Sequence, residues 1–136
     1  MITKQQLKGY RSLVREIVDL DAELNSLYGV RERKTSESHG GNTVTDLSST
    51  IIRMIELEEL IKMKRDKLVA ERTEIEKFID ILPPYERLVI RHRYIQGFSW
   101  VQIQMRLEMS ESSVHRLHGQ SLRRLALRNG ESMEKN

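Results

Sequence analysis

The chain has 136 residues, of which 32% are charged and 5% are aromatic. This length accommodates one modest domain or two small units but no large enzyme core, and so few aromatic residues favour helices over a β-sandwich. Because the sequence has no cysteine, disulfide bonds and thiolate metal ligands are excluded. The first residues contain no continuous apolar run like that of a signal peptide or a membrane span. We therefore expect a cytoplasmic protein that does not associate with membranes.

Positive charge is concentrated in the last third of the sequence. Residues 84–130 contain 8 arginines and 3 glutamates, whereas residues 1–83 contain 14 basic and 15 acidic side chains. Such an excess attracts polyanions such as nucleic acids. An excess of this size also occurs on helical surfaces that bind nothing, so charge alone does not identify a nucleic-acid-binding domain.

The first predicted helix starts at a capping box formed by Thr3 and Gln6, whose side chains satisfy each other's backbone donors. Apolar side chains then recur at steps of three and four residues, which is typical of a helix with one buried face. They are Leu7, Tyr10, Val14, Ile17, Leu24 and Tyr28. Gly29 is a natural helix end. The polar, glycine-containing stretch 30–45 has no periodicity and predicts a flexible loop.

A second, longer helix is predicted from the cap at Asp46 to the Pro83-Pro84 pair, which ends it. Its apolar positions form a heptad-like seam. They are Leu47, Ile51, Met54, Ile61, Leu68, Ile75, Ile79 and Leu82. The pattern predicts an antiparallel coiled-coil helical hairpin. Because the second helix is longer than the first, part of its seam needs another cover, either the C-terminal unit or a second copy of the chain. We predict both, with a dimer favoured and Ile61, Leu68 and Ile75 in the contact between copies.

Three shorter helices are predicted after the prolines, at residues 85–96, 99–107 and 110–128. Gly97 ends the first, a capping box of Ser99 and Gln102 opens the second, and Ser110 caps the third. Two helices joined by three residues have the outline of a helix-turn-helix. The predicted all-α organisation is a helical hairpin at 1–83 with its loop at 30–45, a DNA-binding domain at 84–130 and a disordered tail at 131–136.

The last predicted helix has two different faces. At 100° per residue, one face gathers Val114, Leu117, Ser121 and Leu125, and the opposite face gathers Ser112, Arg116, Gly119 and Arg123, flanked by Ser113 and His115. A guanidinium can donate two hydrogen bonds to a guanine edge, and serine hydroxyls can reach bases or phosphates. We therefore expect Arg116 to read a base. Contacts to phosphate are expected from Ser99, Ser110, Arg123 and Arg124.

The segment "ERLVIRHRYIQGFSWVQIQMRLEMSESSVHRLHGQSLRRL", residues 86–125, resembles region 4 of bacterial sigma factors, the helix-turn-helix that reads the −35 promoter element. The shared positions are Gly97, Ser99, Ile103, Leu107, Ser110, Val114 and the closing "SLRRL". By position, this resemblance implies recognition contacts from Glu111, Ser112, Ser113, His115 and Arg116. The sequence departs from the pattern at Gln104, where a small residue is usual, and at Glu108, where a glycine in the turn is common. His92 replaces an aliphatic residue.

The chain also resembles the ArpU-like late-gene transcriptional regulators of Gram-positive phages. The resemblance lies in "RLHGQSLRRL", in Ser99-Trp100 and in the upstream "IIRMIELEELI". It implies a regulator, an activator of late genes, that binds double-stranded DNA in the bacterial cytoplasm and contacts host RNA polymerase. A dimer would read half-sites about 34 Å apart, or a multiple of that.

Simpler interpretations apply to several of these residues. Arg116 can be a solvated surface charge, Glu111 can stabilise the helix dipole, and Ser110 can serve only as a cap. His115 and His118 have no third ligand nearby, so no metal site is predicted, and Trp100 is interpreted as a lid on a small core. Gly119 fits either close approach of DNA or tight helix packing.

Three functions remain open at this point. The main prediction is a sequence-specific transcriptional regulator. One alternative is a subunit like the phage small terminase, which joins a helix-turn-helix to a coiled coil in a ring of many copies. The other is an adaptor that contacts RNA polymerase without binding DNA. No arrangement of nucleophile, base and pocket is visible, so we predict neither an enzyme nor a cofactor.

Overall fold

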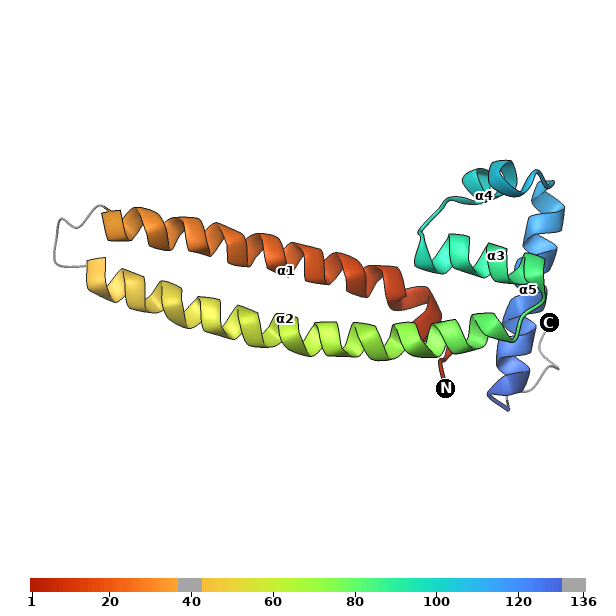
Figure 1. The fold of residues 1–136 in the computed structure, drawn as a ribbon, viewed down its shortest axis with the longest axis horizontal. Coiled ribbons are helices and arrows are strands. Elements are labelled where there is room, and N and C mark those ends of the chain that lie inside the picture. Colours follow the sequence, from red (N-terminus) through yellow and green to blue (C-terminus); the bar gives the residue numbers. More distant parts are fainter. Residues whose placement is uncertain (37–42, 131–136) are drawn as a thin grey trace. The chain divides into compact units, whose positions relative to one another are not determined.

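The computed structural model describes residues 1–36 and 43–130, and this part of the chain is entirely helical. Figure 1 shows the elements in chain order, which are α1 (Lys4–Ser36), α2 (Thr43–Asp80), α3 (Pro84–Ile90), the π-helical turn η1 (Arg91–Ile95), α4 (Trp100–Leu107) and α5 (Glu111–Arg128). The predicted all-α fold class is confirmed. The predicted tail at 131–136, the middle of the predicted loop and the side chain of Asp46 lie outside the described residues.

The chain divides into two compact units. The helix-pair unit consists of residues Leu13–Leu68, and the C-terminal unit consists of Met1–Ser12 together with Val69–Asn136. Helices α1 and α2 contribute residues to both. The sequence predicted a boundary at 83/84, whereas the C-terminal unit also includes the end of α2 and the first twelve residues of the chain.

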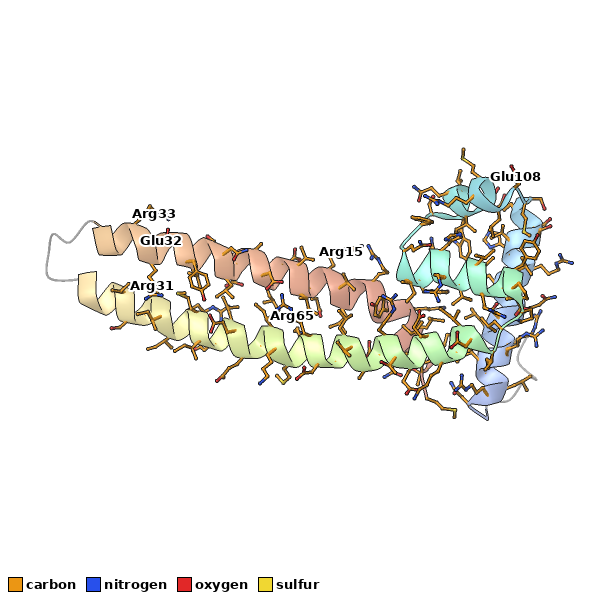
Figure 2. The ribbon with its side chains drawn as sticks, in the orientation of Figure 1. Arg15, Arg31, Glu32, Arg33, Arg65 and Glu108 are labelled. Atoms are coloured by element: carbon orange, nitrogen blue, oxygen red, sulfur yellow. The ribbon has the colours of Figure 1, made fainter. Side chains whose placement is uncertain are left out.

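In the helix-pair unit, α1 and α2 run side by side in opposite directions (Figure 1). Polar contacts join the two helices along their length. Lys64 contacts Glu16 at 3.3 Å and Arg65 contacts Asp21 at 2.7 Å, whereas Arg53 contacts Glu23 at 3.0 Å and the Tyr28 hydroxyl donates to Glu58 at 2.6 Å. Figure 2 labels Arg65 on α2. The buried apolar side chains of this unit are Leu13, Ile17, Met54, Leu57 and Ile61. The ion pairs therefore flank an apolar core and match the antiparallel order.

The loop predicted at residues 30–45 is too long at both ends. Helix α1 continues through Gly29 to Ser36, and α2 begins at Thr43 instead of after the predicted cap at Asp46. Residues 37–42 lie outside the described part of the chain. A glycine inside a helix costs about 1 kcal/mol relative to alanine. In a helix of 33 residues, neighbouring turns offset this cost, and a glycine alone does not end the helix.

The predicted interface between copies requires correction. Ile61 is 3% exposed and Ile75 is 0% exposed within a single chain, so neither side chain is accessible to a second copy. Leu68 is half-buried. Large apolar side chains that α2 does expose are Ile51, Ile52, Ile55, Met63 and Val69. The heptad pattern identified residues that face the chain's own core, because the same periodicity serves packing within a chain and between chains.

In the C-terminal unit, the end of α2 contributes the buried side chains Ile75, Phe78 and Ile79, and the buried Leu82 follows the helix. Nη1 and Nη2 of Arg91 donate to Oε1 and Oε2 of Glu76, at 2.9 Å each. Hydrogen bonding to Arg91 lowers the pKa of Glu76, so the carboxylate stays charged. This two-bond pair attaches η1 to α2.

The first residues of the chain are attached to the same unit by two further contacts. Arg11 donates to the carbonyl oxygen of Ile95 at 3.3 Å, and Asn129 donates to that of Ile2 at 3.0 Å. Gly97, with a φ of 75°, follows η1, and a Cβ atom at this position would lie 2.7 Å from Nε of Arg11. Glycine is favoured here by its backbone conformation, and a side chain would in addition displace the guanidinium of Arg11.

Candidate nucleic-acid interface

Helix α4 begins at the capping box that the sequence predicts. The N–H of Gln102 donates to the Ser99 hydroxyl at 3.2 Å, and the N–H of Ser99 donates to the Gln102 side chain at 2.8 Å. These bonds satisfy backbone donors that have no partner within the helix. Ser99, a predicted phosphate contact, is exposed, but its hydroxyl oxygen already accepts one bond.

The turn between α4 and α5 has the geometry that the glycine-containing turn pattern implies. Glu108 lies in the left-handed region, at φ 52° and ψ 47°, and Figure 2 labels it beside the end of α4. A non-glycine residue in this conformation costs roughly 1 kcal/mol. Two residues later, the Ser110 hydroxyl caps α5 by accepting the N–H of Ser113 at 3.2 Å, and it donates to the Ser113 hydroxyl at 2.9 Å. The predicted cap is confirmed.

A small apolar core lies beneath α4 and α5. Val89 of α3, Ile103 of α4 and Val114 of α5 are all 0% exposed. Partly buried side chains pack around them, namely Phe98, Trp100, Leu107, Met109 and Leu117. One residue from each of three helices meets in this core, so the core fixes which face of α5 points inward and which points to solvent.

Aromatic rings close one side of this core. The ring of Trp100 lies 4.7 Å from that of His115 and 4.8 Å from that of His118, and the guanidinium of Arg93 lies 4.4 Å from the Trp100 ring centre. Trp100 is therefore a lid on the core, as the sequence analysis interpreted it. His115, a predicted base reader, is exposed but has one ring face near Trp100.

His118 is half-buried, and its Nε2 lies 2.6 Å from the hydroxyl of Tyr94. Burial, followed by the positive charges of His115, Lys8, Arg93 and Lys4, lowers the pKa of His118 to about 4. The ring is therefore neutral at pH 7. Burial also raises the pKa of Tyr94, so its hydroxyl keeps its proton and can donate it to the ring nitrogen. Within the described residues, no group of three or more possible metal ligands occurs.

The arginines of residues 84–130 fall into two sets. Five contact the protein itself: Arg87 donates to a backbone oxygen, Arg91 binds Glu76, Arg93 lies over Trp100, Arg106 lies over Phe98, and Arg124 binds Glu86. Arg116, Arg123 and Arg128 have no hydrogen bond, ion pair or ring contact with any described residue. All three belong to α5, and helical spacing places Arg116 and Arg123 on its outward face.

Most of the predicted base readers lie on the exposed side of α5. Glu111, Ser112, His115 and Arg116 are exposed, whereas Ser113 is half-buried and engaged with Ser110. The Ser112 hydroxyl also lies 3.2 Å from that of Ser110. Nε2 of His115 lies 3.7 Å from the Glu111 carboxylate, one turn back. The structure thus brings four of the five side chains to one surface of the helix.

Arg124 has a different position from its neighbour Arg123. Glu86 is 3% exposed, and its carboxylate accepts bonds from Nε of Arg124 at 3.0 Å and from the Ser121 hydroxyl at 3.2 Å. A buried carboxylate requires such partners. Arg124, a predicted phosphate contact, therefore connects α5 to α3 although its side chain is 50% exposed, whereas the exposed Arg123 has no partner among the described residues.

The first turns of the chain add basic side chains to the C-terminal unit, which was not predicted from the sequence. Residues 1–12 contain Lys4, Lys8 and Arg11 and no acidic residue, and they belong to the same compact unit as α5. Lys4 and Lys8 are close enough to His118 to lower its pKa. No local pattern predicts this arrangement, because it depends on the fold rather than on sequence neighbours.

Comparison with known proteins gives one match. Residues 23–124 match the family described as Protein of unknown function (DUF722). The chain belongs to this family. The DUF722 segment includes α2, α3, η1 and α4 and every side chain predicted to read bases. No curated protein and no solved structure matches the chain. Among the described residues, no helix is both long and apolar enough to span a membrane.

Proposed function

We propose that this chain is a sequence-specific transcriptional regulator that binds double-stranded DNA through a helix-turn-helix. In this proposal, α4, the turn at Glu108 and α5 form the motif, and α5 enters the major groove. The observation that supports it best is the outward face of α5. Within the described part of the chain, Arg116 and Arg123 lie there without protein partners, whereas five other arginines of residues 84–130 contact the protein.

The chemistry of this face fits a duplex. A major groove about 12 Å wide admits one α-helix, and an arginine can donate two hydrogen bonds to O6 and N7 of guanine. Arg116 is placed one turn after the helix start, where a helix in the groove contacts bases. Arg123, two turns further along, is suited to a phosphate. Ser112 and Glu111, both exposed, can accept or donate at neighbouring base edges.

The helix-pair unit is proposed to be a coiled-coil hairpin that supports assembly of two copies. Since Ile61 and Ile75 are buried in their own chain, the contact between copies would use other side chains, such as the exposed Ile52 and Ile55. Together with the resemblance to ArpU-like regulators and to sigma region 4, this favours an activator of phage late genes in the bacterial cytoplasm that contacts host RNA polymerase.

The proposal is tested by selecting bound fragments from a random library of double-stranded DNA with the purified chain. We expect an enriched motif, and an affinity for it that falls steeply as salt increases. Arg116→Ala should weaken binding by about 1–3 kcal/mol and relax one base position of the motif. Arg15→Ala is the control, because Arg15 is an exposed arginine of α1 (Figure 2) in the helix-pair unit. It should leave affinity and motif unchanged.

The outcome also separates the other functions. Bound fragments without any enriched motif, or no bound fragments at all, would favour the adaptor that contacts RNA polymerase. A native mass corresponding to a ring of eight or more copies, together with binding to packaging DNA, would favour a terminase-like subunit. An Arg116→Ala chain with unchanged affinity and motif would show that the outward face of α5 is not the reading surface.

A further inference from the structure

Gly119 lies in the middle of α5, on the outward face, between Arg116 and Arg123. Glycine weakens a helix interior because its backbone loses more conformational freedom on folding than that of any other residue. The sequence offers two reasons for a glycine here, which are tight packing within the protein and close approach of a ligand. The structure distinguishes between them.

Packing within the chain gives no reason for the glycine. A Cβ atom at Gly119 would have only Nη1 of Arg123 nearby, at 4.0 Å, which is an ordinary van der Waals distance. By contrast, a Cβ atom at Gly97 would lie 2.7 Å from Nε of Arg11. No other described side chain would obstruct an alanine at position 119, and alanine would stabilise the helix.

We propose that Gly119 is the point at which α5 comes closest to the DNA duplex. This inference rests on the proposed function. A helix with its side chains is about 10–12 Å across and nearly fills a major groove about 12 Å wide. A residue without a side chain lets the backbone move inward at that point. Closest approach then lies near the middle of α5 and not at its first turn.

The two arginines support this position. Arg116 precedes Gly119 by three residues and Arg123 follows it by four, so both share its face of the helix and lie about one turn away on either side. Neither has a protein partner among the described residues. Two cations on either side of a bare stretch of backbone are suited to a polyanion that contacts that backbone. Gly119 then positions Arg116 at the base edges and Arg123 at a phosphate.

The test measures affinity and thermal stability of Gly119→Ala and Gly119→Leu, with the duplex that the wild-type chain enriches from a random library as the probe. Gly119→Ala should raise the melting temperature and weaken binding about tenfold, mainly by faster dissociation. Gly119→Leu should weaken binding further, because its side chain is larger, while the chain stays folded by circular dichroism.

Gly9→Ala is the matched control. Gly9 lies inside α1, where a Cβ atom would have no neighbouring atom within 4 Å, so alanine should raise the melting temperature there too but leave affinity within roughly twofold. A Gly119→Leu chain that binds with wild-type affinity, while Arg116→Ala weakens binding, would overturn this inference and leave the proposed function standing. A wild-type chain that binds no DNA would overturn both.

Discussion

The two units of the molecule use their charged side chains differently. In the helix-pair unit, acidic side chains of α1 form exposed ion pairs with basic side chains of α2, as in Glu16–Lys64 and Asp21–Arg65. In the C-terminal unit, Arg124 instead pairs with the buried Glu86 and connects α5 to α3. On α5 of that unit, Arg116 has no such partner among the described residues.

This difference indicates which charges have a structural role. Exposed ion pairs contribute about 0–1 kcal/mol each, so those of the helix-pair unit favour one pairing of the helices without adding much stability. A buried carboxylate that loses its partner costs considerably more. An arginine that is engaged in neither way, on a helix held by its opposite face, is available for a ligand. The arginines available to a ligand are therefore identified from the contacts of each side chain and not from the net charge.

The largest expected effect tests the core of the helix-pair unit. Ile61→Asp places a charge where the wild-type side chain is 3% exposed, so it should destabilise this unit by about 4 kcal/mol or more. Met63→Asp is the control, because Met63 of the same helix is 65% exposed, and it should change stability by less than about 0.5 kcal/mol. Urea denaturation followed by circular dichroism measures both. If the Ile61→Asp chain stayed folded and sedimentation showed that only its assembly into oligomers was lost, Ile61 would lie in the interface between copies after all.

A smaller effect on stability is expected at the adjacent residues Arg123 and Arg124, which should respond differently to replacement by alanine. Arg124→Ala leaves the Glu86 carboxylate with Ser121 as its described partner, so it should destabilise the C-terminal unit by about 1–3 kcal/mol. Arg123→Ala should change the free energy of unfolding by less than about 0.5 kcal/mol. It should, however, weaken DNA binding and reduce the slope of log affinity against log salt concentration by about one.

Denaturation and binding at several salt concentrations distinguish the two variants. If Arg123→Ala destabilised the fold as much as Arg124→Ala does, the division between structural and ligand-binding arginines would not hold. Replacing the pair together, by Glu86→Gln with Arg124→Met, should recover part of the stability lost in Arg124→Ala, because no charge then remains buried.

The smallest effect depends on pH. In the folded chain the pKa of His118 is lowered from its ordinary value of 6.5 to about 4. As pH falls from 6.5 toward 4, the unfolded chain therefore binds a proton that the folded chain does not, and stability falls. For this half-buried ring, after allowance for screening by solvent, the loss from pH 7 to pH 5 should be on the order of 1 kcal/mol.

His118→Gln should lack this part of the pH dependence, whereas His115→Gln, at an exposed position of the same helix, should keep it. Free energies of unfolding from urea denaturation at several pH values provide the comparison. Identical pH profiles for the wild-type chain and His118→Gln would show that the ring is more accessible to solvent than the structure indicates.

Much of the local structure was predictable because its causes are local. The capping boxes at Thr3 and Ser99 and the cap at Ser110 each depend on side chains within three residues of the backbone donor. The left-handed Glu108 was implied by the resemblance to sigma region 4, in which a glycine is common at this position of the turn. The extent of α1 was not, because Gly29 has a weak local preference that the helix on either side overcomes.

Sequence by itself determined that this protein is all helical, and it identified the arginine- and serine-bearing face of its last helix, because periodicity and capping act over a few residues. Only the tertiary structure decided which charges have partners. It placed Arg124 on Glu86, across 38 residues of sequence, and Arg11 against Gly97. It also buried Ile61 and Ile75 within one chain. The burial of a side chain and its choice of ionic partner depend on which distant segments pack together, and residue spacing along the chain does not predict that packing.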